Sequence, residues 1–292
     1  MAMRELGVLD RKEPQVMAIL NATSDSFSDD GVLVEVDPAA AAGAVARRAQ
    51  LEGASIVDIG GASTRPGASI VSSTEEWRRV RLVFDAALDA CDLPLSIDTF
   101  HGDVARHALG AGASIVNSVH GLRTDGGWNR RLADACVEYG AWLVLTHCGM
   151  RRTGFGEIGP HDVDVGQSDI VEVVLRDLDE QAAAASRFGI RTDRLILDPG
   201  VGFGKGPRQC EDILRAYPRF AGLGLPVILA VSRKSVLGHL LGDAANPDRD
   251  AATIAVSALA SDLGAALVRV HDVGRNAQAI RVSRALARRA TN

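Results

Sequence analysis

An alternation of short apolar runs with Ala-rich amphipathic segments, repeated eight times, constrains the fold of this chain more than any other feature. Short apolar runs that stop at polar or glycine residues predict strands buried on both faces, as in a parallel sheet. The predicted strands cover residues 16–20, 55–59, 93–97, 113–116, 141–145, 195–197, 226–231 and 266–270.

The segments between these strands predict helices, because their apolar residues recur at helical spacing. Asp37 and Pro38 form an N-cap followed by proline at the first helical position. Ser73 and Glu76 have the spacing of a capping box at the start of the second helix. The predicted helices cover residues 39–51, 77–88, 101–109, 128–139, 169–188, 210–217, 251–263 and 276–288.

Eight strand–helix units in 292 residues predict an α/β fold, a (β/α)₈ TIM barrel that forms a single domain over residues 1–292. A doubly wound sheet is the alternative. It would favour a Gly-x-Gly-x-x-Gly turn after the first strand, and residues 21–25 contain no glycine. In a barrel, active sites gather at the carboxyl ends of the strands.

Composition excludes several classes of function. The formal net charge of −5 argues against a nucleic-acid partner, since such proteins usually carry a basic face. No apolar run reaches the length of a membrane span, and residues 1–14 are charged, so we expect a cytoplasmic protein that does not bind membranes. The four cysteines form no Cys-x-x-Cys pair, which argues against a zinc site or a disulfide framework.

Seven polar residues stand at or near the ends of six of the eight predicted strands. A single polar residue at a strand end is usually a cap or a turn former. Amide, acid and base side chains on six strands, all directed to one mouth, instead favour a binding site. These residues are Asn21, Asp98, Asn117, Asp198, Lys234, Arg269 and His271. Two long Gly/Ser/Asp-rich loops, at residues 23–36 and 60–72, follow the first two strands and are typical of loops that cover a site.

The loop after Asp198 is rich in glycine, which lets the backbone approach a ligand closely, although a tight turn alone would also explain it. Residues 200–206 are not a phosphate-binding P-loop, because the spacing is one residue short and Gly206 replaces the required Ser or Thr. Thr64 and Arg65 pair a hydroxyl with a guanidinium, which suits a phosphate or carboxylate.

The candidate residues divide into two chemical groups. Asp98, Asn117 and Asp198 would accept hydrogen bonds from the donor-rich edge of a flat heterocycle such as an aminopyrimidinone. Lys234 would donate to a carbonyl or ring nitrogen. A second group would hold a phosphate or its magnesium complex, and its members are Asn21, Arg65, Arg269 and His271.

Six motifs, in order along nearly the whole chain, resemble dihydropteroate synthase. They lie at residues 21–29, 61–67, 96–99, 198–205, 232–235 and 269–273. The resemblance implies a TIM barrel that joins 4-aminobenzoate to 6-hydroxymethyl-7,8-dihydropterin pyrophosphate, with release of pyrophosphate and 7,8-dihydropteroate for folate synthesis. It also implies a sulfonamide target and a homodimer.

The same resemblance assigns roles to single residues. It implies that Arg269 lies against the pterin and reaches the pyrophosphate, that His271 holds the pyrophosphate, and that Asn21 does so through Mg²⁺. The pterin would be bound by Asp98, Asn117, Asp198 and Lys234. Asp29, Thr64 and Arg65 would order the site, and Phe27, Pro66, Phe203 and Ser235 would shape the 4-aminobenzoate slot. Catalysis, without a protein nucleophile, would fall to Asp198, Lys234, Arg65 and Arg269 through positioning and electrostatic stabilisation.

Some positions depart from the family pattern: Ser24, Asp30, Ser118 and residues 146–148. These departures leave open a divergent paralogue that uses another amine, and a non-catalytic pterin-binding protein. A methyl-transferring pterin barrel is less favoured, since it has no use for an anion-binding group. Because side chains alternate along a strand, we expect Ser118 to point away from the mouth and to accept a hydrogen bond from a backbone N–H group.

Overall fold

The computed structural model describes residues 4–7, 9–22, 32–62, 71–124, 126–149, 169–243 and 248–287. Eight parallel strands form one sheet in the order β8-β7-β4-β3-β2-β1-β10-β9, and a parallel bridge between Leu197 and Val227 joins its two ends. The strands are β1 (Gln15–Asn21), β2 (Ile56–Gly60), β3 (Leu95–Asp98), β4 (Ile115–Ser118), β7 (Trp142–Thr146), β8 (Leu195–Asp198), β9 (Ile228–Leu229) and β10 (Leu267–Val270). The predicted barrel is confirmed, and the doubly wound alternative is wrong.

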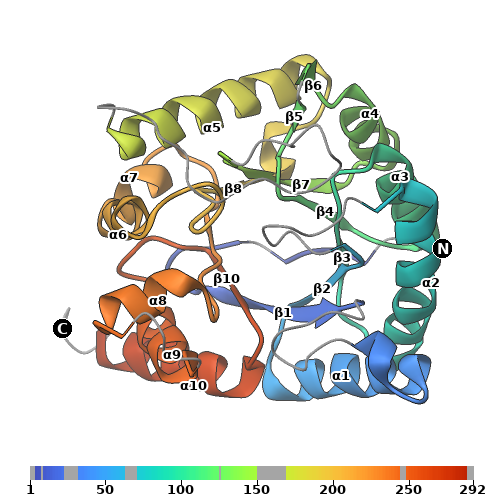
Figure 1. Cartoon of the computed structure of the whole chain (residues 1–292), viewed down its shortest axis with the longest axis horizontal. Helices are drawn as coiled ribbons and strands as arrows, with labels where there is room; N and C mark the ends of the chain where they lie inside the picture. The colour runs from blue at the N-terminus through green and yellow to red at the C-terminus, as the bar shows by residue number, and fades with distance from the viewer. Residues whose placement is uncertain are drawn as a thin grey trace.

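Helices surround the strands on all sides (Figure 1). They are α1 (Pro38–Glu52), α2 (Ser73–Ala90), α3 (Gly102–Ala111), α4 (Arg130–Tyr139), α5 (Ile170–Arg187), α6 (Pro207–Arg215), α7 (Tyr217–Ala221), α8 (Ser235–Leu240), α9 (Asp250–Ala258) and α10 (Val273–Ala287). Short 3₁₀ helices lie at Val32–Val34 and Thr192–Arg194, and a hairpin joins β5 (Arg123–Thr124) to β6 (Gly127–Trp128). The hairpin and α8 were not predicted, because elements this short show no periodicity.

One predicted helix start is correct and another is displaced. The backbone N–H of Ala40 donates to Asp37 Oδ1 at 3.0 Å, which confirms the cap of α1. On α2 the cap is Ser72, whose Oγ accepts from the N–H of Glu75 at 3.3 Å, so the predicted capping box of Ser73 and Glu76 is wrong. Glu76 shares the inward face of α2 with Val80, and it is buried there.

The barrel interior is filled by one apolar cluster. Its members are Leu6, Met17, Ile56, Ile115, Val144, Ile196, Ile228 and Leu267. Alternate strand residues, such as Val57 and Val116, belong instead to the larger cluster that includes residues of the helices. Because the side-chain period of a strand is two, residues two or four positions after an inward-facing one also point inward, nearer the carboxyl end. This places a polar layer above the apolar filling.

Ser118 lies on the outward side of β4, as predicted. Its side chain is fully buried, and Oγ donates to the carbonyl of Gly121 at 2.8 Å, in the turn after the strand. The hydroxyl acts here as a donor, and the expected role as an acceptor stays a prediction. None of the helices in the described ranges combines the length and the apolar character that a membrane crossing requires.

Candidate functional site

The strand register brings the predicted polar residues together at one end of the barrel. Asn21 lies opposite Gly60, Gly60 opposite Asp98, and Asp98 opposite Asn117. Further round the barrel, Asp198 lies opposite Thr146. The carboxyl ends of these strands therefore form a single polar mouth above the apolar interior.

A buried carboxylate, Asp58 on β2, organises the centre of this mouth. Its Oδ2 accepts from Arg269 Nε at 2.7 Å and from Asn117 Nδ2 at 3.0 Å. Arg269 Nη2 also donates to Asp98 Oδ2 at 3.0 Å. The side chain of Asp58 is completely buried, so its charge depends on these partners. Asp58 thus fixes two of the predicted site residues, and Arg269 links it to a third.

Sequence reasoning missed Asp58, because it stands inside an apolar run instead of at its end. Period-two alternation was the signal that could have found it. Asp58 is two positions after the inward-facing Ile56, so it points into the barrel, where an acid needs a partner.

Asp198, at the end of β8, is held by the glycine loop that follows it. Its Oδ1 accepts from the backbone N–H of Gly200 at 2.7 Å. Gly200 has φ +68°, and a Cβ there would lie 1.9 Å from the carbonyl oxygen of His147. No side chain can be accommodated at position 200, which accounts for the glycine. This contact uses only Oδ1, which leaves the second oxygen, Oδ2, for a ligand.

Lys205 holds the same loop through hydrogen bonds from its ammonium group. Its ammonium donates to the carbonyls of His147 (3.0 Å), Gly200 (2.8 Å) and Phe203 (3.0 Å). Burial lowers the pKa of Lys205 to about 8. An ammonium has three protons, and these contacts use all of them. The role of Lys205 is therefore to hold the loop, which agrees with the rejection of a phosphate-binding P-loop.

Lys234 reaches across the mouth toward this loop. Its Nζ donates to the carbonyl of Val201 at 2.6 Å and lies 4.2 Å from the centroid of the Phe203 ring. Burial lowers the pKa of Lys234 to about 8, although the nearby Asp198 carboxylate acts in the opposite direction. Lys234 therefore carries a charge at neutral pH, and it stands beside the Phe203 ring.

Burial raises the pKa values of two acids of the mouth, whereas it lowers those of Lys205 and Lys234. Burial raises the pKa of Asp98 to about 7, against the effect of the Arg269 guanidinium. Burial also raises the pKa of Asp198. An acid and a base with pKa values shifted toward neutrality in one mouth, here Asp98 and Lys234, are typical of functional sites.

The remaining described candidates lie around the rim. His271, directly after β10, is hydrogen-bonded through Nδ1 to Ser232 Oγ at 2.8 Å. Asn21 is half-buried at the end of β1, and Ser235 is exposed at the first position of α8. Five candidates lie outside the described residues: Phe27, Asp29, Thr64, Arg65 and Pro66.

A metal site built from protein side chains alone is not found in the described part of the chain. There, no group of three or more His, Cys, Asp or Glu residues could hold a metal ion.

Comparisons with known proteins agree on one family. The family model described as pterin binding enzyme matches residues 17–271. Dihydropteroate synthase of Streptococcus pyogenes serotype M1 is 37% identical over 268 residues, which are 91% of this chain and 93% of that protein. The probable bifunctional folylpolyglutamate synthase/dihydropteroate synthase of Haloferax volcanii is 39% identical over 95% of this chain, which spans only 31% of that longer protein.

Solved structures give the same result. The Xanthomonas albilineans dihydropteroate synthase with 4-aminobenzoic acid has a TM-score of 0.81 and 39% identity, over 95% of this chain and 94% of that one. The same enzyme in complex with 7,8-dihydropteroate has a TM-score of 0.78 and 35% identity, over 96% of this chain and 95% of that one.

Proposed function

The chain belongs to the family of pterin binding enzymes, and on that premise we propose that it catalyses the dihydropteroate synthase reaction. In this reaction 4-aminobenzoate displaces pyrophosphate from 6-hydroxymethyl-7,8-dihydropterin pyrophosphate, and 7,8-dihydropteroate forms. The observation that carries the proposal is the polar mouth, where Arg269 joins Asp58 to Asp98 and Asp58 also accepts from Asn117. Asp198 adds a further hydrogen-bond acceptor to the mouth, and Lys234 adds a donor.

The pterin fits this mouth by hydrogen-bond complementarity. The aminopyrimidinone edge of a pterin presents N–H donors beside a carbonyl acceptor. Carboxylates at Asp98 and Asp198 accept from the donors, and the ammonium of Lys234 donates to the carbonyl. Asn117 Nδ2 is already engaged by Asp58, which leaves the amide oxygen of Asn117 to accept. Asp98, Asn117, Asp198 and Lys234 would each gain a partner once the pterin is bound.

The chemistry is a displacement at the pterin methylene. The C–O bond to pyrophosphate breaks, its electron pair leaves with the pyrophosphate oxygen, and positive charge develops on the methylene and the ring. The amine of 4-aminobenzoate then forms the new C–N bond and loses a proton. The carboxylates of the mouth stabilise the developing cation, while Arg269 and His271 stabilise the leaving anion. Positioning of the two substrates supplies the remaining acceleration.

The 4-aminobenzoate slot is proposed beside Phe203, whose ring already packs under the Lys234 ammonium. Ser235, which follows Lys234 and is exposed, would contact the carboxylate end of this substrate. The roles of Phe27, Asp29, Thr64, Arg65 and Pro66 stay predictions. So do the single-domain organisation and the cytoplasmic location.

We propose that Mg²⁺ accompanies the pyrophosphate, with the amide oxygen of Asn21 as its protein ligand. Oxygen ligands suit Mg²⁺, which often keeps water and substrate phosphates as most of its shell. When bound, the ion would neutralise charge on the leaving pyrophosphate. Asn21 fits this role, because it is half-buried, uncharged and at the strand end opposite Gly60.

Metal removal gives a direct test of this assignment. We expect EDTA to stop pyrophosphate release and added Mg²⁺ to restore it, since the ion would act on the pyrophosphate. Calorimetric binding of a pterin without pyrophosphate should hardly change. If chelation also removes that binding, the ion lies at the pterin and not at Asn21.

Pterin binding is expected to be strongest between about pH 7 and about pH 8. Below the pKa of Asp98, about 7, the protonated acid must lose its proton before it can accept from the pterin. Above the pKa of Lys234, about 8, the ammonium loses the charge that favours the pterin carbonyl. On the acid side we expect the affinity to fall by up to about tenfold per pH unit for one proton.

Calorimetric titration from pH 5 to 9 measures this profile. Glu76→Gln is the matched control, because burial also raises the pKa of Glu76 to about 7. The fall in pterin affinity at low pH should persist in this variant. If Glu76→Gln removes it, Glu76 and not Asp98 is the titrating group.

We further propose that the protein is a homodimer. Val282 and Leu286, one turn apart on α10, are large apolar side chains with 60% and 68% of their surface exposed. Leu259, at the end of α9, is also exposed, and α9 packs against α10. A second copy could cover these apolar side chains, and sedimentation equilibrium would measure the mass of the assembly.

A pyrophosphate-release assay, run with the pterin pyrophosphate in the presence and absence of 4-aminobenzoate, tests the proposed function. We expect release that depends on 4-aminobenzoate. Tight pterin binding without release would identify a non-catalytic binding protein, and release only with a different amine would identify a paralogue.

A further inference from the structure

Arg233, between Ser232 and Lys234, has a backbone conformation that is unusual for its residue type. Its φ is +59°, and it is the one non-glycine residue with positive φ among the described residues. The N–H of Lys234 donates to the carbonyl of Val231 at 3.0 Å, so Arg233 is the third residue of a tight turn. Turns with positive φ at this position favour Gly or Asn, because other side chains are strained there.

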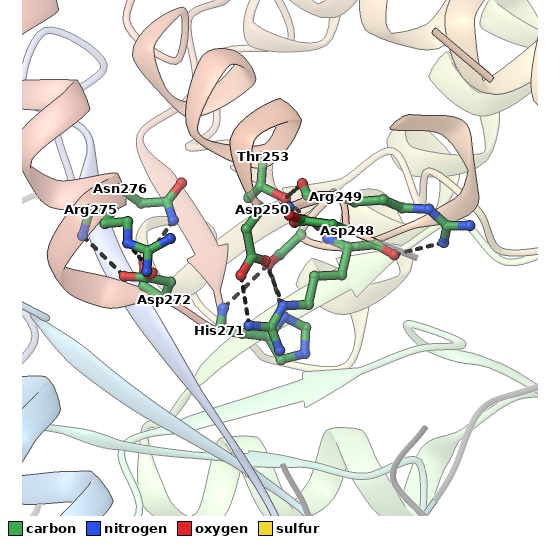
Figure 2. Close-up of polar contacts among 10 residues, drawn as sticks. Asp248, Arg249, Asp250, Thr253, His271, Asp272, Arg275 and Asn276 are labelled. Carbon is green, nitrogen blue, oxygen red and sulfur yellow. Dashed lines mark hydrogen bonds and ion pairs between the residues drawn. The ribbon is translucent and has the colours of Figure 1, made fainter. Parts of the chain in front are cut away.

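The first turn of α9 holds Arg233 in this conformation through three groups. Its guanidinium forms a two-pronged pair with Asp250, at 2.7 and 3.0 Å. Its backbone N–H donates to Thr253 Oγ1 at 3.2 Å, and its carbonyl accepts from Arg249 Nη1 at 3.1 Å. Figure 2 shows Arg249, Asp250 and Thr253 gathered at this point, near His271. Both the backbone and the side chain of Arg233 are therefore fixed.

The turn directs its two flanking residues to different parts of the mouth. Ser232 Oγ bonds His271 Nδ1 at 2.8 Å and accepts from the His271 backbone N–H at 3.3 Å. Lys234 points to the β8 loop, where Nζ meets the carbonyl of Val201 at 2.6 Å. A change in the turn would therefore displace both Lys234 and Ser232, the residue that supports His271.

We infer that Asp250, assisted by Arg249 and Thr253, is a positioning residue that acts through Arg233 to set Lys234 and His271 for the reaction. The inference rests on the proposed function of the mouth. Asp250 itself lies outside the mouth, and the hydrogen bonds from Arg233 lower its pKa, so it stays charged at neutral pH. The strain of the turn is offset by the contacts with α9, as is usual where functional sites hold unfavourable backbone conformations.

The alternative is an ordinary ion pair that stabilises α9 and leaves the mouth unaffected. The positioning role and the ordinary ion pair predict different effects of a glycine at position 233. Glycine adopts positive φ without strain, so Arg233→Gly should keep the turn even when Asp250 is absent. If the pair only stabilises α9, glycine cannot compensate for the loss of Asp250.

The test uses Asp250→Ala, Arg233→Gly and the double variant in the full chain, with Asp250→Asn in case Asp250→Ala does not fold. Steady-state pyrophosphate release gives KM for the pterin pyrophosphate and kcat. We expect Asp250→Ala to raise KM by about tenfold or more, since displacement of one active-site group by about 1 Å can cost about a hundredfold in rate. The double variant should recover most of this loss.

Glu211→Ala is the matched control, because Glu211 Oε1 accepts from two nitrogens of Arg215, at 3.0 and 2.7 Å, and the exposure of Glu211 is similar, 26% against 27% for Asp250. Glu211 Oε2 also lies 3.5 Å from His239 Nε2 on α8. Glu211→Ala should leave KM within about twofold of wild type, because the pair with Arg215 lies on α6 and touches no residue of the turn. An unchanged KM in Asp250→Ala, or a double variant no better than Asp250→Ala, would overturn the inference.

Thermal melting separates this inference from the proposed function. In the Asp250→Ala background, Arg233→Gly should raise Tm by about 2 °C or more, because it removes strain that the Arg233–Asp250 pair no longer offsets. In the wild-type background the same change should lower Tm, because it removes the ion pair. Tm changes of opposite sign in the two backgrounds support the inference even if the protein shows no turnover. Tm changes of the same sign contradict it.

Discussion

Asp198→Asn and Lys234→Ala are each expected to abolish turnover while the barrel still folds. Asp198 is buried with one oxygen held by the N–H of Gly200, so its other oxygen is the acceptor for the pterin. An amide in its place can keep the Gly200 bond, but it presents N–H groups to the pterin donors. Lys234→Ala removes the donor to the pterin carbonyl and deprives the Asp198 carboxylate of the Lys234 ammonium, which acts to lower the pKa of Asp198.

Loss of a charged hydrogen-bond partner in a buried network costs roughly 1–3 kcal/mol or more. A loss of about 3 kcal/mol from transition-state binding lowers kcat/KM by about a hundredfold or more. Pyrophosphate release measures the rate, and circular dichroism melting checks that the variants fold. Asp193→Asn, on the exposed 3₁₀ turn before β8, is the control and should behave as wild type. A near-wild-type rate for either active-site variant would show that the substituted residue is not needed to bind the pterin.

Asp58→Ala is expected to reduce both stability and pterin binding. The change leaves Arg269 Nε and Asn117 Nδ2 without their shared acceptor. Removal of one partner of a buried ion pair costs about 3–5 kcal/mol, because it leaves an uncompensated buried charge. For a chain of this size, that predicts a fall in Tm of about 6 °C or more. Held by Asp98 alone, Arg269 should also be less firmly positioned, which weakens binding of the pterin.

Asp177 provides a matched control for this prediction. It also accepts from one arginine and one amide, Arg123 at 2.9 Å and Gln181 at 2.7 Å, but it lies on α5 and is partly exposed. Asp177→Ala should therefore lower Tm less than Asp58→Ala and leave calorimetric pterin binding unchanged. If the two variants affect binding equally, the position of Arg269 does not depend on Asp58.

The barrel and most of its polar mouth could be predicted from the sequence, because both follow from local patterns. Strand length, period-two alternation and a polar residue at each strand end are all visible in short windows. The same reasoning predicted that Ser118 faces away from the mouth. Asp198, Lys234 and Arg269 were found because each stands at or near the end of a strand.

The parts that escaped prediction depend on contacts between distant segments. Asp58 matters because Asn117 and Arg269, which lie 59 and 211 residues away in sequence, both bind it. Arg233 needs Asp250, which follows a segment with no recognisable pattern. The start of α2 moved by one residue because the inward face of the helix, with Glu76 and Val80, sets its register. Sequence windows contain none of these tertiary constraints.

Product analysis of a complete reaction tests the central claim most directly. The protein is incubated with 6-hydroxymethyl-7,8-dihydropterin pyrophosphate, 4-aminobenzoate and Mg²⁺, and 7,8-dihydropteroate is quantified by mass spectrometry beside the pyrophosphate released. We expect equal amounts of the two products, neither of which forms with Asp198→Asn. Pyrophosphate without 7,8-dihydropteroate, or no reaction from a wild-type protein that binds the pterin, would contradict the assignment.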